Sequence, residues 1–310
     1  MLRFRSFALA SAIASSCIAP ARAGGNPFAD TVVSYDPGPS PSPGYTNPAA
    51  ALGSPERFTG EGIFPSVVSP FSPPFGTDEI VSISPGGHLT LAFDEPITDD
   101  PNNLFGIDLL IFSNVGFIDG DYPNGVVAGV FGDDGGVIEV SADGVTWHAI
   151  TGVAANGLMP TMGYLDSGPY DATPGTQLTD FTRPVDPLLT LKHMLGLDLG
   201  GVRGLYRGSG GGTGVDIAST GLSSISFVRI SNPAGAVENI EIDALADAAP
   251  RHPGDVNLDG LVNVDDLLAV IGTWGVRQPG SPPTDFNNDG LVNVNDLLTV
   301  ITNWSRGGGA

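Results

Sequence analysis

The stretch VIEVSADGVTWHAI (137–150) places two short runs of alternating apolar and polar residues on either side of Asp143-Gly144. Period-two alternation favours strands, and Asp-Gly favours a turn because glycine readily adopts positive φ. We therefore predict a β-hairpin here. Comparable strand signals recur in HLTLAF (88–93), IDLLIF (107–112), ISFVRISN (225–232) and NIEIDAL (239–245). Many short strands separated by Gly, Pro and Asp predict a β-sandwich or jelly roll over residues 24–248.

The segments around these strands carry weaker signals. Residues 24–79 are rich in Pro and Gly, which favours surface loops and short strands. Four phenylalanines in this region are expected to anchor it: Phe58, Phe64, Phe71 and Phe75. PLLTLKHMLGL (187–197) predicts one short helix.

The N-terminal stretch MLRFRSFALASAIASSCIAPARA (1–23) has the organisation of a secretory signal. Arg3 and Arg5 precede an apolar stretch, and an A-x-A cleavage site ends at Ala23. We expect a secreted chain that is extracellular, on the cell surface or periplasmic. A lipoprotein anchor at Cys17 is a weaker alternative. No later run reaches the roughly 18 apolar residues of a membrane span, so no transmembrane segment is predicted.

The composition limits the partners of the mature chain. Cleavage after Ala23 removes three Arg and the only Cys, leaving nine Lys and Arg against 34 Asp and Glu. A formal charge near −25 disfavours nucleic acid or an anionic membrane as partner. Without disulfides, the stability of the mature chain must come from packing, to which bound metal could add.

The C-terminal part contains an internal repeat. DVNLDGLVNVDD (255–266) is followed thirty residues later by DFNNDGLVNVND (285–296). Small residues and prolines in ALADAAPRHPG (244–254) indicate a preceding linker, which we place at 249–253. After each loop, apolar residues at i, i+3, i+4, i+7 and i+10 predict one apolar helix face. We expect the two faces to pack against each other, since a single short helix cannot bury its own face.

Each repeated loop has the residue types that calcium requires. Alternating Asp and Asn side chains can direct oxygen atoms to one centre, and Gly260 or Gly290 permits the sharp turn that follows. The last Asp opens a helix, where a carboxylate is favoured. The predicted ligands of two calcium ions are Asp255, Asn257, Asp259, the Leu261 carbonyl, Asn263 and Asp266 in loop 1 and Asp285, Asn287, Asp289, the Leu291 carbonyl, Asn293 and Asp296 in loop 2.

A simpler interpretation is two solvated Asp/Asn turns, with Asp266 and Asp296 as helix caps. One copy would leave both interpretations open, whereas duplication with identical ligand spacing favours calcium.

These residues resemble a type I dockerin, which has two D-x-N-x-D-G-x-x-N-x-x-D loops, each followed by a short helix. The resemblance covers about 254–304 and implies an EF-hand-like calcium domain that docks to a cohesin-like or other protein scaffold. Positions ten and eleven, often Ser-Thr in cohesin-recognising dockerins, are Val264-Asp265 and Val294-Asn295 here. Proteins with such tails often belong to polysaccharide-degrading systems.

The larger part is similar to secreted bacterial cell-surface domains. The similarity rests on GGHLTLAFDEPI (86–97), VIEVSADGVTW (137–147), GVRGLYRGSGGGTGVDIA (201–218) and the closing IDAL (242–245). It implies a jelly roll of the galactose-binding or discoidin type. The chain departs from the pattern at SNVGF (113–117), where the family usually has Glu-Asn-Gly-Phe.

The residues predict a non-catalytic domain, with an enzyme as the alternative. The four histidines have no metal-binding spacing, no G-x-S-x-G elbow is present, and many of the Asp residues lie in turn sequences. A glycoside hydrolase, acting through two carboxylates, is the enzymatic alternative. GSGGGTG (208–214) lacks the Lys and helix of a phosphate loop and is interpreted as a flexible loop.

Carbohydrate contact is the non-catalytic hypothesis for this region, since sugar sites use exposed aromatic faces. The candidates are Trp147, Tyr122, Tyr164, Tyr170 and Tyr206, with Arg203 and Arg207 nearby in sequence. The mid-strand position of Trp147 favours a core role instead. Asp216 and Asp243 are candidates either for a structural calcium or for hydrogen bonds to loops.

The sequence thus predicts a mainly β protein with a signal peptide (1–23), a β-sandwich domain (24–248), a linker (249–253), a calcium-binding dockerin domain (254–304) and a short tail (305–310). Its expected function is that of a secreted cell-surface protein. The C-terminal domain docks to a protein, and the β-domain contacts a surface or a polysaccharide. A polysaccharide-degrading enzyme or its accessory subunit, and a purely structural envelope protein, are the alternatives.

Overall fold

The hairpin predicted at 137–150 is present in the computed structural model, which describes residues 25–305. β9 (Val137–Ser141) pairs antiparallel with β10 (His148–Ala149). The connection is longer than a two-residue turn, because Asp143 Oδ1 accepts hydrogen bonds from the backbone N–H of Val145 and Thr146. The signal segment with Cys17 and Ala23 lies outside the described residues.

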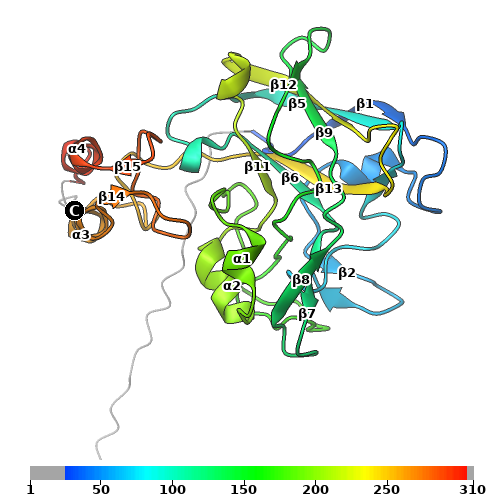
Figure 1. The fold of residues 1–310 in the computed structure, drawn as a ribbon, viewed down its shortest axis with the longest axis horizontal. Helices are drawn as coiled ribbons and strands as arrows, with labels where there is room; N and C mark the ends of the chain where they lie inside the picture. The colour runs from blue at the N-terminus through cyan, green and yellow to red at the C-terminus, as the bar shows by residue number, and fades with distance from the viewer. Residues whose placement is uncertain (1–24, 306–310) are drawn as a thin grey trace, which may run out of the picture.

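The fold is mainly β and consists of antiparallel sheets (Figure 1). The largest sheet has the order β1 (Thr31–Asp36), β5 (His88–Thr98), β12 (Ser224–Ser231), β9 and β10. The second has the order β11 (Thr213–Val215), β6 (Leu109–Ser113), β13 (Ile240–Asp247) and β4 (Val81–Ile83). Three two-stranded ribbons are formed by β2 (Phe58–Thr59) with β3 (Ser66–Val67), β7 (Gly116–Asp119) with β8 (Val127–Phe131), and β14 (Gly275–Val276) with β15 (Leu291–Val292).

The two larger sheets share one core. Leu89 and Leu91 of β5 face it from one sheet, and Leu109 and Ile111 of β6 face it from the other. Every residue of β6 is buried, because its alternate residues Leu110 and Phe112 enter a second cluster on the opposite face. Burial on both faces explains why this strand is a nearly continuous apolar run.

A third apolar cluster supports two helices beside the β7–β8 ribbon. The predicted short helix is present as α1 (Leu191–Met194). A second helix, α2 (Leu199–Tyr206), was not predicted, although Asp198 caps it by accepting from Gly201 N at 2.7 Å. Short 3-10 turns occur at Pro48–Ala51, Leu104–Gly106 and Ala218–Thr220.

Two expectations about the glycine- and proline-rich segments were wrong. Phe71 is buried as expected, but Phe64 is 78% exposed and anchors nothing. GSGGGTG (208–214) is not a flexible loop, because most of it is buried and it leads directly into β11. A Cβ at Gly210 would lie 2.1 Å from the Phe181 ring, so the glycines allow close packing.

The C-terminal module (254–305) follows a linker that is attached to the β-domain. β13 continues to Asp247, so residues 244–247 belong to the sheet rather than to a linker. Ala249 N donates to Thr182 O at 2.9 Å, and Arg251 N donates to Asn102 O at 3.1 Å. The module contains α3 (Val264–Gly272), α4 (Val294–Thr302) and the β14–β15 ribbon, and it lies at one end of the molecule (Figure 1).

Candidate metal centres

The two repeated loops adopt the same backbone conformation. Leu258 and Asn288, at equivalent positions, have φ of 61° and 54°, and the glycines two residues later also have positive φ. Asn263 and Asn293 cap α3 and α4 with identical dihedral angles, φ −147° and ψ −162°. Because a non-glycine residue at positive φ is strained, its occurrence at matched positions shows that both loops are folded into one defined shape.

In loop 1, the first and last carboxylates bind the loop's own backbone. Asp255 accepts from Leu258 N at 2.7 Å and from Gly260 N at 2.9 Å. Asp266 accepts from Val256 N at 2.8 Å and from Asn263 N at 2.9 Å, and its side chain is buried. Asp266 therefore closes the loop onto the start of α3, the position predicted for the last calcium ligand.

Loop 2 repeats this arrangement. Asp285 accepts from Gly290 N at 2.9 Å, and Asp296 accepts from Phe286 N at 2.7 Å and Asn293 N at 2.8 Å. The intermediate positions also match, since the amide of Asn257 donates to Asp259 at 3.0 Å and the amide of Asn287 donates to Asp289 at 2.9 Å.

Like charges lie close together in both loops. The pKa of Asp255 is raised by burial, and the negative charges of Asp266 and Asp259 add to this effect. Burial and the charges of Asp296 and Asp289 raise the pKa of Asp285 in the same way. A bound cation would remove this repulsion.

The donor chemistry fits calcium. Each loop offers three carboxylates, two amide oxygens and a backbone carbonyl, all hard oxygen donors. Within residues 25–305, no three His, Cys, Asp or Glu side chains form a metal-holding group by themselves. An ion here would therefore also depend on the Asn and carbonyl oxygens, and the carboxylates would exchange some backbone N–H contacts for the ion.

The expected packing of the two helices was wrong in one respect. Val270 and Val300 enter the small core of the module, with Leu267 and Leu297 beside them. The other residues of the two predicted apolar faces are exposed, namely Val264, Leu268, Ile271 and Trp274 after loop 1 and Val294, Leu298, Ile301 and Trp304 after loop 2. Each helix is apolar on two sides, and only one side can face the partner helix.

A buried arginine lies between the two loops. Arg251 donates to the carbonyls of Pro283 and Asp285, and its guanidinium stacks 4.2 Å from the centre of the Phe286 ring. Burial lowers the pKa of Arg251 to about 10, so the side chain stays charged at neutral pH. No feature of the linker sequence predicted this role.

The aromatic candidates of the β-domain separate into exposed and buried groups. Tyr206 is buried and donates to Pro160 O, so it cannot serve as a sugar platform. Trp147 was expected in the core but is only half-buried. The guanidinium carbon of Arg229 lies 3.8 Å from the centre of its ring. Tyr122 is 74% exposed, and its ring centre lies 5.0 Å from that of Tyr170.

The two isolated acidic candidates form hydrogen bonds to loops. Asp216 is exposed and accepts from Ala218 N at 2.8 Å. Asp243 is buried and accepts from Glu56 N. Burial and the nearby charge of Glu56 hold the pKa of Asp243 well above its ordinary value.

Neither a scan against protein-family models nor a search of the curated proteins found a match to this chain. In residues 25–305, no helix combines the length and apolar character needed to cross a membrane.

Proposed function

We propose that residues 254–304 form a calcium-dependent docking module of the dockerin kind, and that the chain is a secreted cell-surface protein. One observation carries this proposal: the two helices that follow the loops present matching apolar residues to solvent. Leu268 and Leu298 are 58% and 49% exposed, and Ile271 and Ile301 are 52% and 51% exposed. Large exposed apolar patches usually mark interaction sites.

The duplication supports a docking role for this surface. The exposed residues occur at equivalent positions of α3 and α4, and a tryptophan follows each helix. Exposed tryptophans are often the strongest contributors to protein interfaces. Each helix is capped by one proposed ligand, Asn263 or Asn293, and carries another, Asp266 or Asp296, in its first turn. Calcium would therefore fix the helix that presents the surface.

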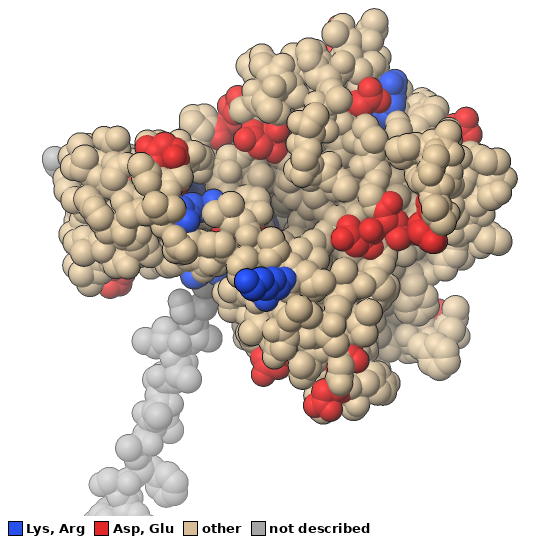
Figure 2. Space-filling view, viewed as in Figure 1, with Lys and Arg blue, Asp and Glu red and all other residues tan. Residues whose placement is uncertain are grey.

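The β-domain is proposed to contact a surface or a polysaccharide through a jelly-roll-like double sheet. The charge of the chain agrees with a neutral or cationic target, and acidic side chains are spread over the visible face (Figure 2). The exposed Tyr122, paired with Tyr170, gives this domain an aromatic face beside the carboxylate of Asp119, which accepts from Tyr170 OH.

Calcium binding is tested by calorimetric titration of the mature chain with CaCl₂, with MgCl₂ as the control. We expect two sites that are selective for calcium. An absence of calcium binding at millimolar concentration would overturn the proposal.

Docking is tested with an immobilised type I cohesin domain as the probe. In calcium the wild-type chain should be retained, and Leu268→Asp combined with Leu298→Asp should abolish retention. Val237→Asp is the matched control, because Val237 is exposed on the β-domain. Calcium binding without cohesin retention would show that the docking partner belongs to another class.

Polysaccharide contact is tested by co-sedimentation with insoluble glycans. Saturable retention that is lost in Tyr122→Ala would support the aromatic face as the contact. If retention is unaffected by this change, the contact lies elsewhere on the domain.

A further inference from the structure

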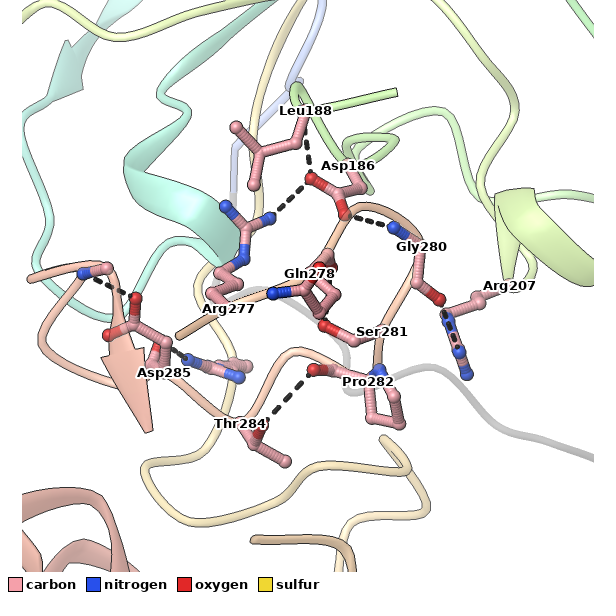
Figure 3. A network of polar contacts seen from close by, with 12 residues as sticks. Asp186, Leu188, Arg207, Arg277, Gln278, Gly280, Ser281, Pro282, Thr284 and Asp285 are labelled. Atoms are coloured by element: carbon pink, nitrogen blue, oxygen red, sulfur yellow. Dashed lines mark hydrogen bonds and ion pairs between the residues drawn. The ribbon is translucent and has the colours of Figure 1, made fainter. Parts of the chain in front are cut away.

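The C-terminal module is joined to the β-domain by a buried ion pair (Figure 3). The carboxylate of Asp186 accepts from the guanidinium of Arg277 and, at 2.7 Å, from Gly280 N. The side chains of Asp186 and Arg277 are 3% and 12% exposed. Arg207 donates to Gly280 O at 3.0 Å, and the Arg277 guanidinium lies 4.5 Å from the centre of the Phe105 ring. A desolvated pair with several further contacts fixes geometry far better than a surface ion pair.

Arg277 connects this junction directly to loop 2. Its backbone N–H donates to Gly290 O at 3.0 Å, continuing the β14–β15 ribbon. Gly290 N in turn donates to Asp285, the first proposed ligand of loop 2, at 2.9 Å. A path of three consecutive polar contacts therefore leads from Asp186 through Arg277 and Gly290 to that carboxylate.

A second support reaches the same loop from the linker. The guanidinium of Arg251 donates to the carbonyls of Pro283 and Asp285, and its own backbone N–H is held by Asn102 O. The segment that enters loop 2 is thus held from two sides by residues attached to the β-domain.

Loop 1 has different supports. Asp255 N donates to His252 O at 3.0 Å within the linker, and Val262 N donates to Ser305 Oγ at 2.7 Å at the far end of the chain. These contacts lie within the C-terminal module and its connection, whereas the ion pair to the β-domain lies on the side of loop 2. The two loops have nearly the same sequence but different surroundings.

Resting on the proposed calcium sites, we infer that Asp186 is a positioning residue for loop 2: acting through Arg277, it holds the loop ready for calcium, so that loop 2 binds calcium more tightly than loop 1. The physical reason is preorganisation. An ion that binds an already ordered loop does not have to offset the conformational entropy lost in ordering that loop. Attachment of the C-terminal module to the β-domain and calcium binding at loop 2 are then linked, and each favours the other.

The test uses the full mature chain with one loop disabled at a time. Asp259→Ala leaves loop 2 as the calcium site, and Asp289→Ala leaves loop 1. Asp186→Asn is added to each, and the calcium Kd is measured by titration calorimetry. We expect Kd to rise about fivefold or more in the chain that retains loop 2 and less than about twofold in the chain that retains loop 1.

Further variants separate positioning from general destabilisation. Arg277→Gln should reproduce the effect of Asp186→Asn. The double variant should have little more effect than either single variant, because both changes remove the same ion pair. Asp186→Glu retains the charge and should recover part of the affinity. Glu139→Gln is the matched control, because it removes the partner of Arg229 on the five-stranded sheet, an ion pair of 3.7 Å.

The outcomes distinguish this inference from the proposed function. Two calcium sites that weaken equally in Asp186→Asn, or that do not weaken, would overturn the positioning role and leave the docking module intact. A wild-type chain that binds no calcium would overturn both. Loss of affinity confined to loop 2 supports the inference.

Discussion

The β-domain and the C-terminal module are stabilised by different means. The main cluster of the β-domain contains 22 buried apolar residues, whereas the core of the C-terminal module contains six. A unit of about 50 residues with so small a core needs a further source of stability, such as a metal or a neighbouring domain. The difference teaches that local order can rest on apolar packing in one region and, in the other, on carboxylates that bind the backbone of their own loops.

The largest expected effect is a loss of packing in the β-domain. Phe112 is fully buried and packs edge-to-face on Phe181, with ring centres 5.3 Å apart. Phe112→Ala should lower the free energy of unfolding of this domain by about 3–5 kcal/mol, through lost burial and a residual cavity. Chemical denaturation with and without a chelator would measure it. A loss of unfolding free energy below about 1 kcal/mol in either condition would show that packing at β6 is not the main source of the stability of the β-domain.

Calcium removal should have the next largest effect, and it should act on the other region. At a free calcium concentration of 100 Kd, a site bound only in the folded state contributes about 2.7 kcal/mol. A chelator, or Asp259→Ala combined with Asp289→Ala, should therefore unfold much of α3 and α4 and leave residues 25–248 folded, while the segment 277–290, held by Arg277 and Arg251, keeps part of its order. Far-UV circular dichroism and the melting transition of the β-domain would separate the two. Asp133→Ala, at an exposed Asp of the β-domain, is the control. Full helical signal in chelator would contradict the coupling.

A smaller effect distinguishes the two apolar sides of α3. Val270 is buried in the module core, whereas Leu268 is exposed. Val270→Ala should cost about 1.5–2 kcal/mol of module stability, and Leu268→Ala less than about 0.5 kcal/mol. Thermal unfolding of both variants, at saturating calcium, would measure the ratio of the two stability losses. Equal costs would mean that Leu268 is covered in solution by another surface.

The sequence predicted those features that depend on local patterns. Alternating apolar and polar residues, with Asp-Gly between them, predicted the hairpin at 137–150. β6 was expected as a strand because its sequence is a nearly continuous apolar run. The Asp/Asn spacing of the repeats predicted which side chains share a loop, and the structure places them on matched loops.

Features that depend on tertiary contacts could not be predicted in this way. A helix that is apolar on two sides does not reveal which side is buried, so Leu268 was assigned to the wrong face. The glycines of 208–214 suggested a flexible loop, but they allow close packing against Phe181. The helix at 199–206 had detectable signals, namely Asp198 as a cap and apolar spacing at Leu199, Val202 and Tyr206. The Asp186–Arg277 pair joins residues 91 positions apart, and no sequence pattern indicates it.

The smallest expected effect is a pH dependence confined to the β-domain. Glu56 lines an open acidic cavity of about 510 Å³ together with Glu61, Asp78 and Glu79. Burial, with the charges of Glu79, Glu61 and Asp78, raises the pKa of Glu56 from 4.5 to about 7. Between these two values, Glu56 holds a proton in the folded state that it has lost in the unfolded state. The stabilisation is therefore complete below about pH 4.5 and declines as the pH rises through about 7.

Because Glu56 is partly exposed, we expect this decline to be only about 1 kcal/mol after solvent screening. Glu56→Gln should reduce the slope, with a remainder due to the buried Asp243, whose pKa is also raised. Glu61→Gln, at a neighbouring position, should leave most of the slope. Denaturation midpoints of the β-domain between these pH values, measured in chelator so that cation binding by the repeated loops does not contribute, would test the prediction. A slope of opposite sign, or one unchanged in Glu56→Gln, would assign the titration to other carboxylates.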